Sequence, residues 1–178
     1  MMTAVEFVHV EVKRLHAMLE GTLSGITAEQ LHAVPAGHAK ANTIAWGLFH
    51  CVRTEDNVVR FVLQDRRPTI WMEGGYADRL ALPPVAQGTG MTTQEAQGLR
   101  LKDLALFREY VAKVWASTDD YLARVDPAAL DATVTIKPLG DMPAIRALME
   151  VCVTHGFTHA GEIELARTLV GAKPVSGV

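Results

Sequence analysis

The strongest constraint on the fold is the spacing of the apolar residues, which recur every three or four positions through four long segments. The segments cover roughly residues 3–19, 42–64, 92–123 and 141–170. A repeat of this length is typical of a helix with one buried face. Long helices without a pair of strands predict an all-α fold, a four-helix bundle.

Capping residues indicate where these helices begin. Asn42 is a suitable N-cap for the second segment, and Thr92 with Glu95 forms a capping box before the third. Asp141 is expected to cap the fourth helix, with Pro143 in its first turn, where a missing N–H costs nothing.

Proline and glycine interrupt the pattern between the second and third helices. Residues 65–92 contain seven of them, so we expect no regular element there but a long irregular crossover. This crossover is expected to cover a pocket, with Trp71, Met72 and Tyr76 as packing anchors. Residues 133–136 are β-branched and predict a short extended piece followed by a turn.

Composition narrows the class of protein. The 178 residues carry a net charge of −3, and Lys and Arg form no basic stripe, which argues against nucleic-acid binding. No apolar run approaches the ~20 residues of a membrane span. Two cysteines, Cys51 and Cys152, suit a reducing compartment. We expect a single cytoplasmic domain over residues 1–178, frayed from about residue 172.

The most informative polar pattern lies in the fourth helix. His155 and His159 are four residues apart and therefore share a helix face, and Glu162 returns to nearly the same bearing. Apolar residues share this face, so the imidazoles need partners inside the fold, and a metal ion is one such partner. The spacing alone fits a hydrogen-bonded pair as well as a metal site.

His50 adds a third imidazole, because it lies in the most apolar stretch of the chain, residues 44–52. Helical bundles build metal sites from ligands on facing helices. Three neutral imidazoles with a vacant fourth position are typical of a catalytic divalent site. Glu162 or Cys152 is the candidate fourth ligand if the site is closed, and Cys51 is expected to be a structural residue.

The other four histidines are expected to contact solvent. His9 and His16 share a bearing at the edge of the apolar stripe of the first helix, where a solvated flank is the simpler interpretation. His32 and His38 lie in a loop rich in Gly and Pro and are expected to be exposed.

Two motifs, NTIAWGLFHCVRTED (residues 42–56) and THGFTHAGEI (residues 154–163), make the chain resemble the DinB/YfiT-like family of metal-dependent enzymes. In the first motif an Arg and an acidic pair follow the histidine, matched here by Arg53, Glu55 and Asp56. The resemblance spans nearly the whole chain. It departs at Glu162, where relatives often carry Gln.

The resemblance implies a four-helix bundle in up-down-down-up order with a long crossover between helices 2 and 3. It implies a divalent ion, nickel or zinc, on His50, His155 and His159, and a homodimer formed through the bundle helices. Some relatives are transferases or isomerases that use a low-molecular-weight thiol such as mycothiol, bacillithiol or glutathione. A thiol co-substrate is therefore an expectation from the resemblance alone.

These observations predict a metal-dependent enzyme, a transferase or hydrolase, in which the ion activates a thiol or water nucleophile toward a small-molecule substrate. Glu162 would act as a proton acceptor or orient a ligand, and Glu55 or Asp56 would hold the His50 ring or close an interhelical pair. Trp71 and Tyr76 would line the pocket mouth. The alternative is a non-catalytic bundle in which a structural metal or a histidine cluster only holds the helices together.

Overall fold

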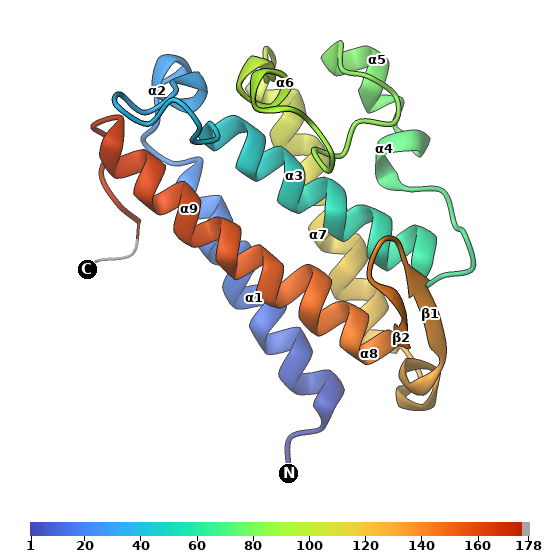
Figure 1. Cartoon of the computed structure of the whole chain (residues 1–178). Coiled ribbons are helices and arrows are strands. Elements are labelled where there is room, and N and C mark those ends of the chain that lie inside the picture. Colours follow the sequence, from blue (N-terminus) through green and yellow to red (C-terminus); the bar gives the residue numbers. More distant parts are fainter. Residues whose placement is uncertain (176–178) are drawn as a thin grey trace.

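Long helices dominate the computed structural model, which describes residues 1–175 (Figure 1). The long helices are α1 (Ala4–Thr22), α3 (Ile44–Asp56), α7 (Leu104–Arg124) and α9 (His155–Leu169). Helix α3 continues into a π-helical turn, η1 (Asn57–Val62), and α9 continues from α8 (Ala144–Ala147) and a second π-helical turn, η3 (Leu148–Thr154). In Figure 1, α1 and the α8–α9 column run one way, and α3 and α7 run the other. The predicted all-α class is confirmed for a mostly helical chain that carries one small sheet.

The crossover contains regular structure, so the prediction that residues 65–92 lack it is wrong. Two short helices lie there, α4 (Ile70–Glu73) and α5 (Tyr76–Leu80). The Thr69 side chain caps α4 by accepting a hydrogen bond from the backbone N–H of Met72. The prolines and glycines limit the length of these helices without abolishing them.

The third segment is divided into two helices rather than one. The capping box of Thr92 and Glu95 starts α6 (Thr93–Gly98), as predicted, and Asp103 caps the separate helix α7. Between them the chain extends so that Leu99 and Leu101 enter the core. Burial of these two side chains accompanies the break between α6 and α7, which the apolar spacing of the segment did not indicate.

The fourth helix does not begin at Asp141. Residues Thr133–Ile136 (β1) and Gly140–Pro143 (β2) form an antiparallel hairpin, with Thr135 opposite Asp141, and the helix starts at Ala144. Gly140 adopts a φ of +89°, which closes the turn. The Asp141 carboxylate accepts a hydrogen bond from the Thr135 hydroxyl at 2.6 Å, so it stabilises the hairpin instead of capping a helix. The extended piece at residues 133–136 was predicted; its partner strand was not.

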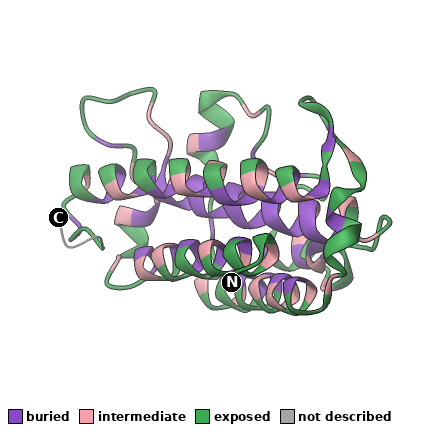
Figure 2. Ribbon diagram, turned by 90° about the horizontal axis from the view of Figure 1, so that it is seen from below, coloured by how far each residue is buried: buried purple, intermediate pink, exposed green. Residues whose placement is uncertain are grey.

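The core is centred on α3, every residue of which is buried (Figure 2). Helix α9 approaches α3 closely at Gly47, where an added Cβ would lie 2.8 Å from Cγ1 of Ile163. Because the two helices run in opposite directions, the next turn of α3, with His50, lies against the first two turns of α9, with His155 and His159. The remaining short helices are α2 (Ala28–His32) and the 3₁₀ turn η2 (Pro127–Asp131).

Fraying from about residue 172 stays a prediction, and the described residues 172–175 form hydrogen bonds with α9. The Ala172 N–H donates to the carbonyl of Arg167, and the Val175 N–H donates to the Glu164 carboxylate at 2.7 Å. Residues 176–178 lie outside the described part. Within residues 1–175, no helix is both long enough and apolar enough to cross a membrane.

Candidate metal centre

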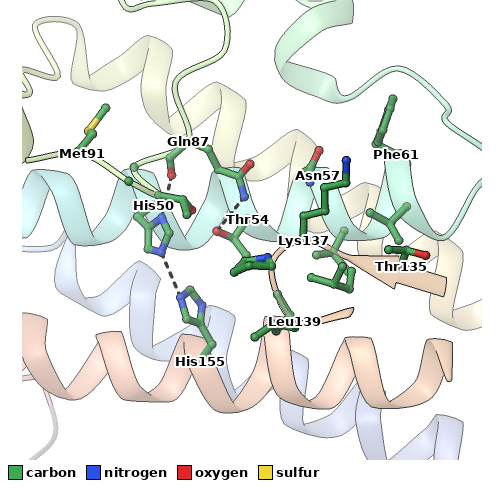
Figure 3. Close-up of a pocket in the computed structure, with 18 of the residues that line it drawn as sticks. His50, Thr54, Asn57, Phe61, Gln87, Met91, Thr135, Lys137, Leu139 and His155 are labelled. Atoms are coloured by element: carbon green, nitrogen blue, oxygen red, sulfur yellow. Dashed lines mark hydrogen bonds between the residues drawn. The ribbon is translucent and has the colours of Figure 1, made fainter. Parts of the chain in front are cut away.

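The structure brings His50, His155 and His159 together. His50 comes from the middle of α3, and the other two come from the first two turns of α9. The Nε2 atom of His155 lies 3.1 Å from Nε2 of His50 and 3.1 Å from Nε2 of His159. One ring nitrogen from each residue lies within 4.8 Å of the other two, so the cluster can hold a metal ion. Figure 3 shows His50 and His155 facing each other across the gap between the helices.

The opposite ring nitrogens already have acceptors. Nδ1 of His50 donates to the carbonyl of Gln87 at 2.8 Å, and Nδ1 of His159 donates to the Glu162 carboxylate at 2.6 Å. A neutral imidazole that donates from Nδ1 has only a lone pair on Nε2. The lone pairs of His50 and His159 therefore both point at Nε2 of His155, where a cation can be shared by the three rings. Acceptors behind the ligating rings are typical of metal-bound histidines, so these residues fit a divalent ion.

Burial keeps His50 and His155 in the form that binds metal. It lowers the pKa of His155 to about 4, an effect reinforced by the neighbouring His159 and His50. Burial also lowers the pKa of His50, against the opposing effect of its hydrogen bond to Gln87. Both rings are neutral at pH 7, and neutral imidazole is the species that coordinates metals.

Two neighbours fix the orientation of the His50 ring. Trp46, one helical turn earlier, stacks on the His50 ring with 4.9 Å between ring centroids. It also makes a T-shaped contact with the His159 ring, with 5.6 Å between centroids. Gly88 lies so close that an added Cβ would be 2.8 Å from Nδ1 of His50. The spacing of Trp46 from His50 could have been noticed in the sequence. The contacts of Gln87 and Gly88 could not, because they come from a distant loop.

A cavity of about 1190 Å³ opens beside the cluster, with His50 and His155 in its wall (Figure 3). Both π-helical turns contribute to the lining, η1 through Val58 and Phe61 and η3 through Val151. Turns of this kind are frequent at functional sites. Two further parts of the lining come from the crossover at residues 87–91 and from the hairpin at residues 133–139.

The aromatic residues of the crossover do not line this cavity, contrary to prediction. Trp71 and Tyr76 are fully buried in the core, and Tyr76 donates a hydrogen bond to Glu109 at 2.7 Å. Met72, the third expected anchor, is 64% exposed. Trp71 and Tyr76 are core anchors, as expected, whereas the pocket is covered by the later part of the crossover.

The two candidates for a fourth ligand lie differently. Glu162 is exposed and binds the outer nitrogen of His159, so its carboxylate orients that ring from behind. Cys152 is buried among apolar side chains, and burial raises the pKa of its thiol well above the usual range. Burial likewise raises the pKa of the Cys51 thiol. Both cysteines are therefore apolar fillers in this structure.

The acidic pair after His50 does not touch that histidine. Asp56 accepts hydrogen bonds from the backbone N–H groups of Ile70 and Trp71 and from the hydroxyl of Tyr110, at 2.8–3.0 Å. Arg53 donates to Asp56 and to the carbonyl of Ala86, the residue before Gln87. The pair thus closes contacts between elements, the other role expected for it, and Arg53 holds the loop that orients His50.

Three of the four histidines expected in solvent are not exposed, and His16 and His32 differ most from that expectation. His16 is buried, bonded to the Glu55 carboxylate at 2.9 Å and stacked on Trp115. The Glu55 carboxylate also accepts a hydrogen bond from the Thr118 hydroxyl at 2.6 Å, so His16 belongs to a hydrogen-bond network between helices. His32 is half-buried: its Nδ1 donates to the Ala28 carbonyl, and its Nε2 accepts from the Leu101 N–H.

The remaining two histidines are closer to what their positions indicated. His9 is half-buried and pairs with Asp119 at 2.8 Å. His38 is exposed, as predicted.

Comparison with known proteins identifies the family. Residues 11–163 match the model of the DinB superfamily. The chain belongs to the DinB superfamily. A crystal structure titled as a conserved protein from Enterococcus faecalis has a similar fold, with a TM-score of 0.81, 19% sequence identity, and coverage of 96% of this chain and 98% of that chain. No curated protein matches the sequence. DinB proteins usually bind a metal ion, and the histidine cluster gives this DinB chain a group that could hold one.

Proposed function

We propose that this DinB protein is a metal-dependent enzyme whose divalent ion, nickel or zinc, is held by His50, His155 and His159. The observation that carries the proposal is the convergence of three imidazole nitrogens in the wall of a cavity, with the opposite nitrogens of His50 and His159 already bonded. The four long helices, α1, α3, α7 and α9, are proposed to form an up-down-down-up four-helix bundle, in agreement with their directions in Figure 1.

A divalent ion in this position supplies one kind of chemistry, since it lowers the pKa of a coordinated thiol or water and yields a nucleophile at neutral pH. The protein's own groups prepare the site. The Gln87 carbonyl and the Glu162 carboxylate hold two rings with Nε2 facing inward. Glu162 is the only one of these acceptors that can also take up a proton, which makes it the candidate acid–base group.

An open site is favoured over a closed structural one. Of the two candidate fourth ligands, Cys152 lies in the apolar core and Glu162 binds the far side of His159. The cavity reaches His50 and His155, so a small molecule has access to the cluster. A thiol transferase reaction, with a low-molecular-weight thiol as one substrate, is the reaction we propose on the basis of the family resemblance. A homodimer likewise stays a prediction, which light scattering tests.

Elemental analysis tests the metal centre directly. Protein purified without chelator is expected to carry about one equivalent of divalent metal, and His155→Ala is expected to lose it, because two imidazoles bind far more weakly than three. His38→Ala removes an exposed histidine and is the matched control. Wild-type protein without stoichiometric metal, or unchanged metal in His155→Ala, would contradict the proposal.

Exchange chemistry separates the enzyme from a structural metal protein. In the cobalt-substituted protein, an open position is expected to admit added thiol or azide, with a change in the visible spectrum. A spectrum that stays constant at saturating thiol and azide would indicate a closed site, and would support the non-catalytic alternative.

A further inference from the structure

The cavity beside the histidines is cationic, although the chain as a whole is acidic. Its charged lining residues are Lys40, Arg66 and Lys137 against one acid, Asp65, whereas the whole chain has a net charge of −3. Within residues 1–175, the side chains of these three cations form no hydrogen bond or ion pair. Positive charge without a protein counter-charge attracts anions into a concave site.

Lys137 has the most specific position of the three. It follows strand β1 directly, and the hairpin pairing up to Gly140 holds its backbone. In Figure 3 its side chain extends from the hairpin across the cavity toward Asn57. Thr54 and Asn57 follow His50 by one and two helical turns, so this part of the cavity lies about 6–10 Å along the helix axis from the metal cluster.

The surfaces around Lys137 suit a small molecule with one anionic end. Thr54 and Asn57 offer a hydroxyl and an amide, both of which can donate to an anionic oxygen. Phe61 and Leu139 line the same cavity and are 41% and 59% exposed, which leaves apolar walls available for a carbon chain. Ligand sites usually combine apolar walls with placed polar groups, and this cavity offers both.

We propose that the cavity binds an organic anion whose carboxylate or phosphate group contacts Lys137, with its reacting end at the histidine cluster. The ammonium group is a compact point charge that suits either head group. Arg66 and Lys40, which also line the cavity, add to the electrostatic attraction. The proposal requires no direct contact between these two residues and the anion. The proposal rests on the proposed function for the chemistry at the histidine end only; the anion contact depends on cavity residues alone.

Chemical-shift titration of ¹⁵N-labelled protein, as purified and at low ionic strength, tests the contact. The probes are butyrate and glycerol 3-phosphate, with butyramide and glycerol as their uncharged counterparts. We expect at least one anion to shift the amides of residues 54–57 and 133–139, and the uncharged counterparts to bind at least tenfold more weakly. The anion with the lower Kd identifies the head group.

Variants separate a specific contact from general attraction. Lys137→Gln is expected to raise the Kd of the bound anion about tenfold or more, the usual effect of losing a charge-assisted hydrogen bond. Lys102→Gln removes an equal charge from an exposed site outside the cavity and should leave the Kd within about twofold. Equal effects of the two variants, equal binding of the uncharged probes, or no binding of either anion would overturn the proposal.

Metal content is measured on the same samples. A metal-free protein that still binds the anion through Lys137 would contradict the proposed function and leave this inference standing. A metal-loaded protein that binds neither anion would contradict this inference and leave the proposed function standing.

Discussion

At the scale of single residues, the site depends on groups that hold the ligands rather than on the ligands alone. Gly88 is the clearest case, because its φ of +92° and its contact with His50 both exclude a side chain. Its neighbour Gln87 supplies the carbonyl that fixes the His50 tautomer. The same loop is anchored by Arg53 through the Ala86 carbonyl. The orientation of His50 is therefore set by a segment more than thirty residues away in sequence.

Replacement of Gly88 by Ala is expected to weaken metal binding. The new Cβ would lie 2.8 Å from Nδ1 of His50, so the loop must move and its hydrogen bond to the ring must lengthen. We expect the metal affinity to fall about 10–100-fold, the usual effect of losing a partner behind a ligand. Competition with a chromogenic chelator measures it. Gly90→Ala is the control, since its φ is +77° but nothing lies within 4 Å of its added Cβ; an equal loss in both variants would refute the contact as the cause.

Substitutions of Glu162 distinguish an orienting group from a ligand. The amide oxygen of Glu162→Gln can still accept from Nδ1 of His159, so metal affinity should stay within a few-fold, whereas Glu162→Leu should lose about tenfold or more. Competition with the chromogenic chelator measures the metal affinity of both variants. If the carboxylate itself coordinates the ion, Glu162→Gln will lose as much affinity as Glu162→Leu.

At the scale of elements, α3 is the hub of the molecule. Asp56 binds the crossover, His50 belongs to the histidine cluster, and Glu55 binds helices α1 and α7. The two π-helical turns also act at this scale. Because a π turn advances each residue by a smaller angle than an α turn, η3 changes the bearing of Cys152 relative to His155. A regular 3.6-residue period places both on one face, whereas only His155 lines the cavity.

The His16–Glu55 pair is expected to stabilise the contact of α1 with α3. His16→Leu leaves the buried Glu55 carboxylate with the Thr118 hydroxyl as its remaining partner, and should lower the free energy of unfolding by about 3–5 kcal/mol. Urea denaturation measures the change. A double variant with Glu55→Leu should recover much of the loss, because no buried carboxylate is then left poorly paired.

The pair of His9 with Asp119 provides the comparison for that experiment. The side chains of His9 and Asp119 are 21% and 42% exposed, so His9→Leu should change the free energy of unfolding by less than about 1 kcal/mol. If His16→Leu costs no more than His9→Leu, the buried network contributes little to the stability of the helix packing.

At the scale of the whole molecule, the histidine cluster joins two helices, α3 and α9, that are far apart in sequence. Helix α9 packs against both α1 and α3, and the cluster lies at its contact with α3. A ligand that binds the folded protein alone stabilises it in proportion to the logarithm of its concentration. An ion bound across α3 and α9 should therefore raise the free energy of unfolding of the whole domain.

Removal of the metal is expected to lower the melting temperature. At a free metal concentration 100-fold above its Kd, the ion adds about 2.7 kcal/mol, which corresponds to roughly 5–10 °C for a chain of this length. Differential scanning calorimetry with and without chelator measures the shift. His155→Ala should melt at the same temperature under both conditions, while His38→Ala should keep the wild-type shift.

The sequence by itself determined the helical class and most of the predicted helix starts, and it singled out the three histidines that the structure brings together. Each of these depends on local spacing. Apolar periodicity and capping residues such as Thr92 act within one or two turns. The i, i+4 pair of His155 and His159 and the apolar setting of His50 are local as well. The tertiary structure alone decided the β1–β2 hairpin, the burial of His16, the loop contacts on His50 and the position of Lys137 in the cavity. These features depend on contacts between distant segments, whose free energies no local pattern records.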